Sequence, residues 1–162
     1  MPRHALVAAM LAGLAMLPAG CGRGEEKAAE QTANPDAPEG ITVTNGRLLL
    51  PPVSGNPAAI YFDITNNSGQ DAMIRSVNVD GAGMAMLHTT VTSNRQTAME
   101  EVSQQPLHTG ETLSFEPGGL HVMAGGLADT ITPGSTVEVT LTFVGGDKVS
   151  FPAEVRAPGD AR

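Results

Sequence analysis

Residues 136–143 decide the fold, and they read TVEVTLTF. Polar and apolar side chains alternate along this segment, and a period of two predicts a β-strand with one buried face. Gly145-Gly146-Asp147 follows closely and supplies the turn of a β-hairpin. We therefore predict a second strand over residues 148–155, antiparallel to the first.

Strand signals also recur through the earlier part of the chain, separated by Gly, Pro, Asn and Asp. No window carries apolar residues at the sustained spacing of a helix. The further strands are predicted at 41–43, 48–50, 58–66, 72–79, 84–91, 97–102, 112–115 and 120–123, and the strand of the hairpin extends over 135–144. Many short strands punctuated by turns predict an all-β fold, an antiparallel sandwich or small barrel.

The N-terminal region has a different composition. Residues 1–20 are typical of an export signal, with a basic start and the apolar run ALVAAMLAGLAML, which is shorter than the ~20 residues of a membrane span. Cys21 follows a small-residue pair, as an acylated lipoprotein cysteine does, although Pro18 stands where Leu is usual. We expect a lipid anchor on Cys21; the alternative is ordinary cleavage that leaves a free cysteine.

The remaining chain divides into a tether, a domain and a tail. Residues 21–40 contain no large apolar side chain and predict a flexible tether. The domain is predicted over 41–156 and the tail over 157–162. About 120 residues beyond the tether are enough for one hydrophobic core and not for two, so we expect a single domain, and a monomer.

Charge and cysteine content exclude several functions. The chain has 17 acidic against 9 basic residues and a net charge of −8, which argues against binding nucleic acid. Its single cysteine lies outside the predicted domain, which excludes an intradomain disulfide, a cysteine-based metal site and a blue-copper centre.

The sequence has no nucleophile elbow, no zinc-protease motif and no nucleotide-binding glycine loop, so we do not expect an enzyme.

Two histidines and two methionines form the candidate site. His88 is followed after ten residues by Met99, which is followed after 21 residues by His121-Val-Met123. Thioether sulfur is a soft, neutral ligand and imidazole binds most late transition metals, so the set suits Cu(I). Neither ligand carries a charge when it binds, and thioethers have no proton to lose, as a carrier requires.

Each of these residues also has a plainer explanation. In the strand over 84–91, Leu87 is the natural core residue and His88 points outward, where a histidine is usually only solvated. Met99 lies among polar residues, although most methionines pack in cores. His121 and Met123 are two apart and project to one side of an extended segment, but Met123 in the core with His121 on the rim is the alternative.

Other soft or imidazole side chains are weaker candidates. Met86 shares a face with His88 and is a candidate auxiliary ligand, although simple packing is the preferred explanation for Met86 and for Met84. Met73 is expected to be structural. His108 follows Pro106-Leu107 in a predicted turn and is expected to be solvated.

The spacing of the four ligands also resembles a known family. A His or Met, ten residues, Met, 21 residues and His-x-Met is the motif of PCuAC periplasmic copper chaperones, and the run NPAAIYFDITNN at 56–67 resembles their first core strand. The resemblance covers roughly residues 41 to 155 and implies a cupredoxin-like Greek-key β fold. Thr89 and Thr90 stand where the family often has more Met or His, and the C-terminus lacks the Met/His-rich tail that holds a second copper in some members.

The resemblance implies a function and partners. We expect a periplasmic Cu(I) chaperone that delivers copper to envelope enzymes, typically the CuA centre of a cytochrome oxidase, often beside a Sco-like protein. Copper sequestration for tolerance would use the same site. A lipid-anchored β-sandwich interaction module without metal is the alternative of a different class.

Overall fold

The computed structural model describes residues 37–160, which form ten β-strands and no helix. Accordingly, no helix within residues 37–160 could cross a membrane. The predicted export signal, Cys21 and most of the predicted tether lie outside the described residues. The strands are β1 (Ile41–Leu49), β2 (Ala58–Asn66), β3 (Ala72–Val79), β4 (Met84–Ser93), β5 (Gln96–Glu101), β6 (Gln105–Leu107), β7 (Thr112–Phe115), β8 (Leu120–Gly125), β9 (Thr136–Phe143) and β10 (Lys148–Arg156).

The predicted C-terminal hairpin is present. β9 buries Val137, Val139, Leu141 and Phe143, the apolar members of its alternating pattern, and pairs antiparallel with β10. Gly145 and Gly146 in the intervening turn have positive φ angles of 115° and 105°, which glycine adopts without a Cβ clash.

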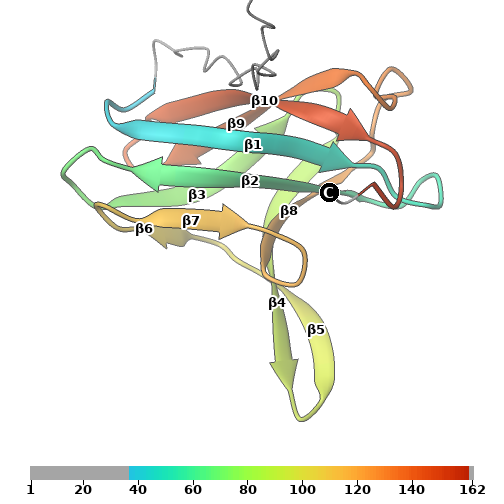
Figure 1. Cartoon of the computed structure of the whole chain (residues 1–162), viewed down its shortest axis with the longest axis horizontal. Helices are drawn as coiled ribbons and strands as arrows, with labels where there is room; N and C mark the ends of the chain where they lie inside the picture. The colour runs from blue at the N-terminus through green and yellow to red at the C-terminus, as the bar shows by residue number, and fades with distance from the viewer. Residues whose placement is uncertain (1–36, 161–162) are drawn as a thin grey trace, which may run out of the picture.

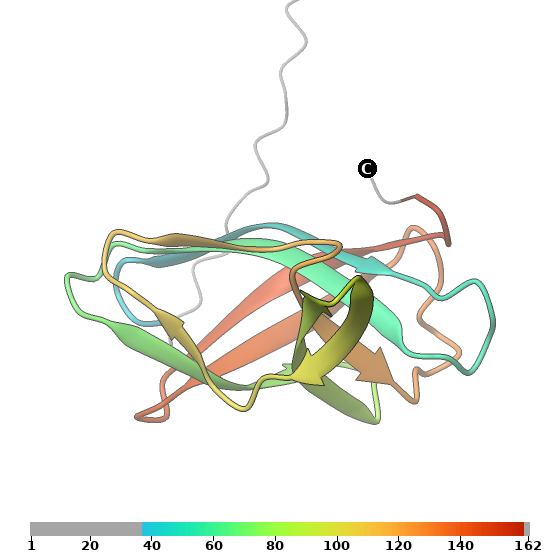
Figure 2. The ribbon, with the colours of Figure 1, turned by 90° about the horizontal axis from the view of Figure 1, so that it is seen from below.

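The strands hydrogen-bond in the order β5-β4-β8-β7-β2-β1-β10-β9-β3-β6, and β8 also pairs with β2. The sheet folds over on itself, and Figure 2 shows a layer of β1, β2 and β7 above a layer that contains β3 and β9. Phe62 lies between the layers, with its ring centre 4.1 Å from that of Phe115 and 4.8 Å from that of Phe151. The all-β sandwich expected from the sequence is therefore confirmed.

Three details differ from the sequence-based prediction. The sheet is mixed, because β1 pairs in parallel with β10, and β7 with β8. The separate strands predicted at 41–43 and 48–50 are one strand with an irregularity between Thr44 and Arg47, where Asn45 has a φ of 59°. β6 lies within a predicted turn; it has only three residues, including a proline, and pairs at the sheet edge with β3.

β4 and β5 form a hairpin that projects from the body of the sandwich (Figure 1). Ser93 pairs with Gln96, so the loop consists of Asn94 and Arg95, whose φ angles are 51° and 64°. Two central residues with positive φ are typical of the type I′ turn that joins two strands tightly. The inner part of β4 pairs with β8 in the body, whereas every residue of β5 is exposed. The candidate ligand Met99 lies on β5 of this hairpin.

Candidate metal centre

The register of β4 against β8 brings candidate ligands together. His88 lies directly opposite His121, and Met86 directly opposite Met123. Directly opposed residues of an antiparallel pair share one face of the sheet, with Cβ atoms about 5 Å apart. The other face of these strands carries Leu87, which is only 3% exposed and packs in the core. The four side chains therefore form one group on the face away from the core.

His121 is positioned by the turn that precedes β8. It is 5% exposed, and its Nδ1 lies 3.0 Å from the backbone carbonyl of Gly119. The amide of Gly119 in turn donates to the carbonyl of Glu116, and Gly118 between them has a φ of 83°, as in a type II turn after a proline. A carbonyl accepts only from a protonated Nδ1, so this bond leaves the lone pair on Nε2. Such a bond orients metal-binding imidazoles in proteins.

His88 is not solvated as a lone outward histidine would be. Both of its ring nitrogens are buried, and neither has a hydrogen-bond partner within residues 37–160. Buried polar atoms without a partner are rare in native proteins and point to a strain, a function or a bound ion. The environment of His88 therefore fits a group that is satisfied only when a ligand is present.

The two imidazoles are close enough to share one ion. Their ring centres are 6.0 Å apart, with planes inclined at 52°. A nitrogen–metal bond of about 2.0 Å places two rings on one ion with centres at most roughly 6.4 Å apart. The observed separation lies within that limit. Within the described part of the chain, no group of three or more His, Cys, Asp or Glu side chains could hold a metal. The other potential donors on the face of His88 and His121 include the thioethers of Met86 and Met123.

Met99 reaches the same face from β5. It lies opposite Thr90, and Glu101 lies opposite His88, so Met99 is the diagonal neighbour of His88 across the hairpin. Met99 is 60% exposed, and core packing therefore does not describe it. An exposed thioether beside His88 can bind a soft ion and remain accessible to a partner.

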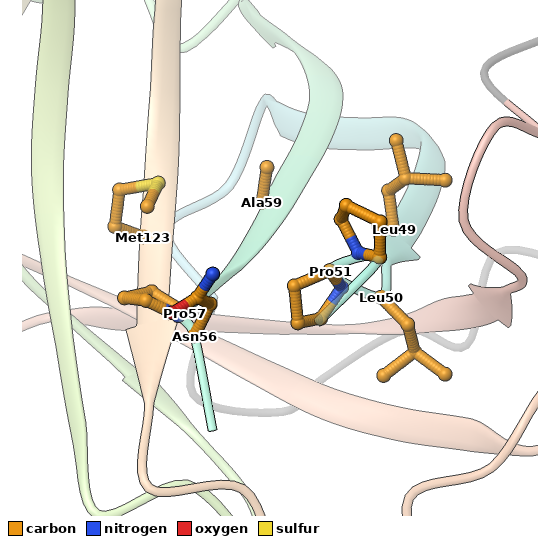
Figure 3. A pocket seen from close by; sticks show the side chains of 8 residues that line it. Leu49, Leu50, Pro51, Asn56, Pro57, Ala59 and Met123 are labelled. Carbon is orange, nitrogen blue, oxygen red and sulfur yellow. The ribbon is translucent and has the colours of Figure 1, made fainter. Parts of the chain in front are cut away.

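Met123 connects the site to an apolar depression. It is half-buried, pairs with Ala59 of β2 as well as with Met86, and lines a shallow pocket of about 350 Å³. Figure 3 shows its side chain at one side of this pocket. The other lining residues are Leu49, Leu50, Pro51, Pro52, Asn56, Pro57 and Ala59. The thioether is thus shielded on its β2 side by apolar groups.

Tyr61 and Arg47 continue this face on β2 and β1, and sequence reasoning did not single them out. Tyr61 follows Ala59 by two residues, so it shares the face of Met123, and it pairs with Arg47. The Arg47 guanidinium carbon lies 5.2 Å from the Tyr61 ring centre. Burial raises the pKa of the Tyr61 hydroxyl, partly offset by the positive charge of Arg47. The Tyr61 hydroxyl therefore stays neutral. An aromatic residue in an alternating strand was its only sequence signal.

His108 lies elsewhere in the fold. It follows β6, at the opposite end of the strand order from β5, and its Nδ1 lies 3.1 Å from Asp71 Oδ2. The hydrogen bond to Asp71, together with the charge of Asp71, raises the pKa of His108. The structure therefore does not bring His108 to the face of His88 and His121.

The fold and this face define a small cupredoxin-like β domain with imidazole and thioether side chains gathered on one sheet face. Residues 41–155 match the family model described as "Putative lipoprotein LpqE-like". The chain belongs to this LpqE-like family. It is also 31% identical over 145 residues to "Putative lipoprotein Lxx21020" of Leifsonia xyli subsp. xyli, covering 89% of this chain and 82% of that relative.

Solved structures confirm the resemblance to PCuAC domains. The copper-bound PCuAC domain of PmoF2 superposes with a TM-score of 0.62 at 20% identity, over 75% of this chain and 97% of that domain, which shows the shared fold. The Cu(I) form of DR1885 from Deinococcus radiodurans has a TM-score of 0.56 at 28% identity, over 85% of this chain and 89% of that protein. Apo-DR1885 matches over 93% of this chain and 100% of its own, at 26% identity. The predicted cupredoxin-like fold is thereby confirmed.

Proposed function

We propose that this protein binds one Cu(I) ion through His88, Met99, His121 and Met123 and carries it to envelope copper enzymes. The observation that supports this most directly is the pair of buried, unpartnered nitrogens of His88, opposite His121 and on a face shared with thioethers. Similar domains are copper-bound in PmoF2 and DR1885, which supports the same cargo here. Softness of the thioethers favours Cu(I) over harder ions.

Each ligand has a distinct task in this proposal. His121, fixed by Gly119, presents Nε2 to the ion. His88 gains through copper the partner that its buried nitrogens lack. Met123 is half-buried on the sheet, whereas Met99 is exposed on the hairpin, where an acceptor can displace it first. All four ligands are neutral, so release leaves no unpaired ligand charge on the carrier.

The setting of the carrier is also proposed. Membership of a family described as lipoproteins supports acylation of Cys21, which would tether the domain at the membrane in the periplasm. The resemblance to PCuAC chaperones supports delivery to the CuA centre of a cytochrome oxidase, directly or through a Sco-like protein. Sequestration for copper tolerance is the second candidate, since it uses the same ligands without transfer.

Anaerobic titration of the tag-free apo-protein with Cu(I), against a chromogenic chelator, tests the binding step. We expect one tight equivalent in the wild type and weaker binding in His88→Ala and Met99→Leu. His108→Ala and Met73→Leu serve as matched controls and should bind like the wild type. Failure of the wild type to take one equivalent would refute the carrier and leave the interaction module.

Transfer distinguishes delivery from sequestration. The Cu(I)-loaded protein is mixed anaerobically with an apo CuA domain, the two proteins are separated, and the copper bound to each is measured. Transfer faster than from free chelated Cu(I) supports delivery, whereas retention of copper on the carrier supports sequestration.

A further inference from the structure

Three thioethers, not two, lie along the β4–β8 ladder. Met84 pairs with Gly125, Met86 with Met123, and His88 with His121. Residues at positions i, i+2 and i+4 of a strand share one face, so Met84 and Met86 lie on the face of the proposed copper site. Met84 extends this face by one residue pair beyond Met123.

Met84 is not a core residue. It is 52% exposed, so the packing expected for it does not account for its position. Its thioether nevertheless lies against the sheet: a Cβ at Gly125 would be 3.2 Å from Met84 Cγ and 3.3 Å from Met84 Sδ. The side chain thus occupies the space above Gly125 that any larger residue would fill. A soft sulfur is held at the surface, next to the proposed site, without being buried.

Exposure decreases along this row toward the proposed copper site. Met84 is 52% exposed, Met86 and Met123 are half-buried, and His121 is 5% exposed. Met84 and Met86 also have the same i, i+2 spacing as His121 and Met123, which lets two donor atoms reach one ion from one strand. This row of side chains therefore places soft sulfur donors between the solvent and the buried imidazoles.

We propose that Met84 and Met86 form a second, weaker Cu(I) position at the entrance to the His88–His121 site. This inference rests on the proposed function, since it describes how the same cargo reaches that site. Two thioethers without an imidazole bind a soft monovalent ion, Cu(I) or its mimic Ag(I), and exclude harder ions. Because thioethers carry no proton to lose, occupancy of this position is independent of pH between 5 and 8.

Methyl resonances of methionine give a direct test. The full mature chain is labelled with [methyl-13C]methionine and titrated anaerobically with Cu(I), and in parallel with Ag(I). We expect the first equivalent to shift the methyl signals of Met99 and Met123, and the second to shift those of Met84 and Met86. In the Met84→Leu/Met86→Leu variant the second step should be lost and the first retained. Met73→Leu is the matched control and should keep both steps.

The outcomes separate this inference from the proposed function. Methyl signals of Met84 and Met86 that stay fixed through two equivalents overturn the second position. Movement of Met84 and Met86 with the first equivalent, and nothing with the second, makes them primary ligands and also overturns it. If the methyl signals of Met84 and Met86 shift while those of Met99 and Met123 do not, the proposed carrier site fails and the thioether position stands.

Discussion

Replacing His88 by leucine should stabilise the apo-protein. The wild-type ring buries two nitrogens without hydrogen-bond partners within residues 37–160, while the neighbouring Leu87 packs in the core. An unsatisfied buried polar group costs about 1–3 kcal/mol, and leucine of similar volume removes that cost. Allowing for imperfect packing of the new side chain, we expect a gain of about 1–3 kcal/mol in the free energy of unfolding. For a domain of this size that is a rise of roughly 4–12 °C in melting temperature.

Cu(I) should stabilise the wild type more than it stabilises His88→Leu. A ligand that binds only the native state stabilises it by about 2.7 kcal/mol at a hundredfold excess over Kd. The wild type should gain this stabilisation from Cu(I), whereas His88→Leu should gain much less. The assay is urea or thermal unfolding of both proteins, apo and with buffered Cu(I), under anaerobic conditions.

A matched substitution tests whether the gain is specific to the site. His108 is exposed and paired with Asp71, so His108→Leu exchanges the same residues without relieving a buried polar group. It should not raise the stability of the apo-protein and should leave the copper response intact. An apo His88→Leu protein no more stable than the wild type would refute the reasoning, because His88 would then have partners in solution.

Three further predictions concern ligands, metals and pH. Met99→Leu and Met123→Leu should each change apo stability by less than ~1.5 kcal/mol, with the smaller change at exposed Met99, while lowering Cu(I) affinity in chelator competition; a large loss of stability with unchanged affinity would make them structural. Zn²⁺ gains little from thioethers, so Cu(I) should displace it in mixed-metal dialysis, and preferential zinc binding would contradict the ligand set. The pKa of His108 is raised by its hydrogen bond to Asp71. At pH values below the ordinary histidine pKa, this pair should therefore contribute its full stabilisation of the fold. That contribution should be lost as pH rises through the raised pKa. The pKa of Asp71 is lowered, first by the Thr109 amide and then by His108, so its contribution should be lost only as pH falls through that lowered value. Urea unfolding between pH 5 and 8.5 should therefore show a flatter profile for His108→Asn than for the wild type, and identical profiles would show that the pair does not form in solution.

The alternating segment at 136–143 predicted β9 and its hairpin because both depend on neighbours in the chain. Its apolar positions are the buried ones, as a period of two requires. The parallel pairing of β1 with β10 joins Arg47 to Glu154, and no local pattern reports a contact across that separation. β6 was missed for the opposite reason: three residues with a central proline carry too little periodicity to be recognised.

The candidate site, like the fold, could be predicted only where it depends on residues close together in the sequence. The i, i+2 spacing of His121 and Met123 and the outward face of β4 follow from strand geometry, and the structure places those side chains on the expected face. His88 and His121 are 33 positions apart in the sequence, and their direct opposition depends on the register between β4 and β8, which only tertiary pairing sets. The bond from His121 to Gly119 and the missing partners of His88 depend on that register too.

The proposed ligands lie on parts of the fold that differ in rigidity, and this gives a physical basis for copper release from the proposed carrier. His121 is buried and fixed by a backbone carbonyl, whereas Met99 is exposed on a two-stranded hairpin outside the sandwich. A two-stranded hairpin alone is marginally stable, so moving Met99 costs less than moving His121 out of the sheet. In the proposed carrier, an acceptor that supplies a ligand at the Met99 side would replace that thioether first and draw copper outward while His121 still holds it. Stepwise exchange of this kind avoids free copper, and it requires the soft, exposed ligand and the buried imidazole to lie on opposite sides of His88, as the order β5-β4-β8 places them.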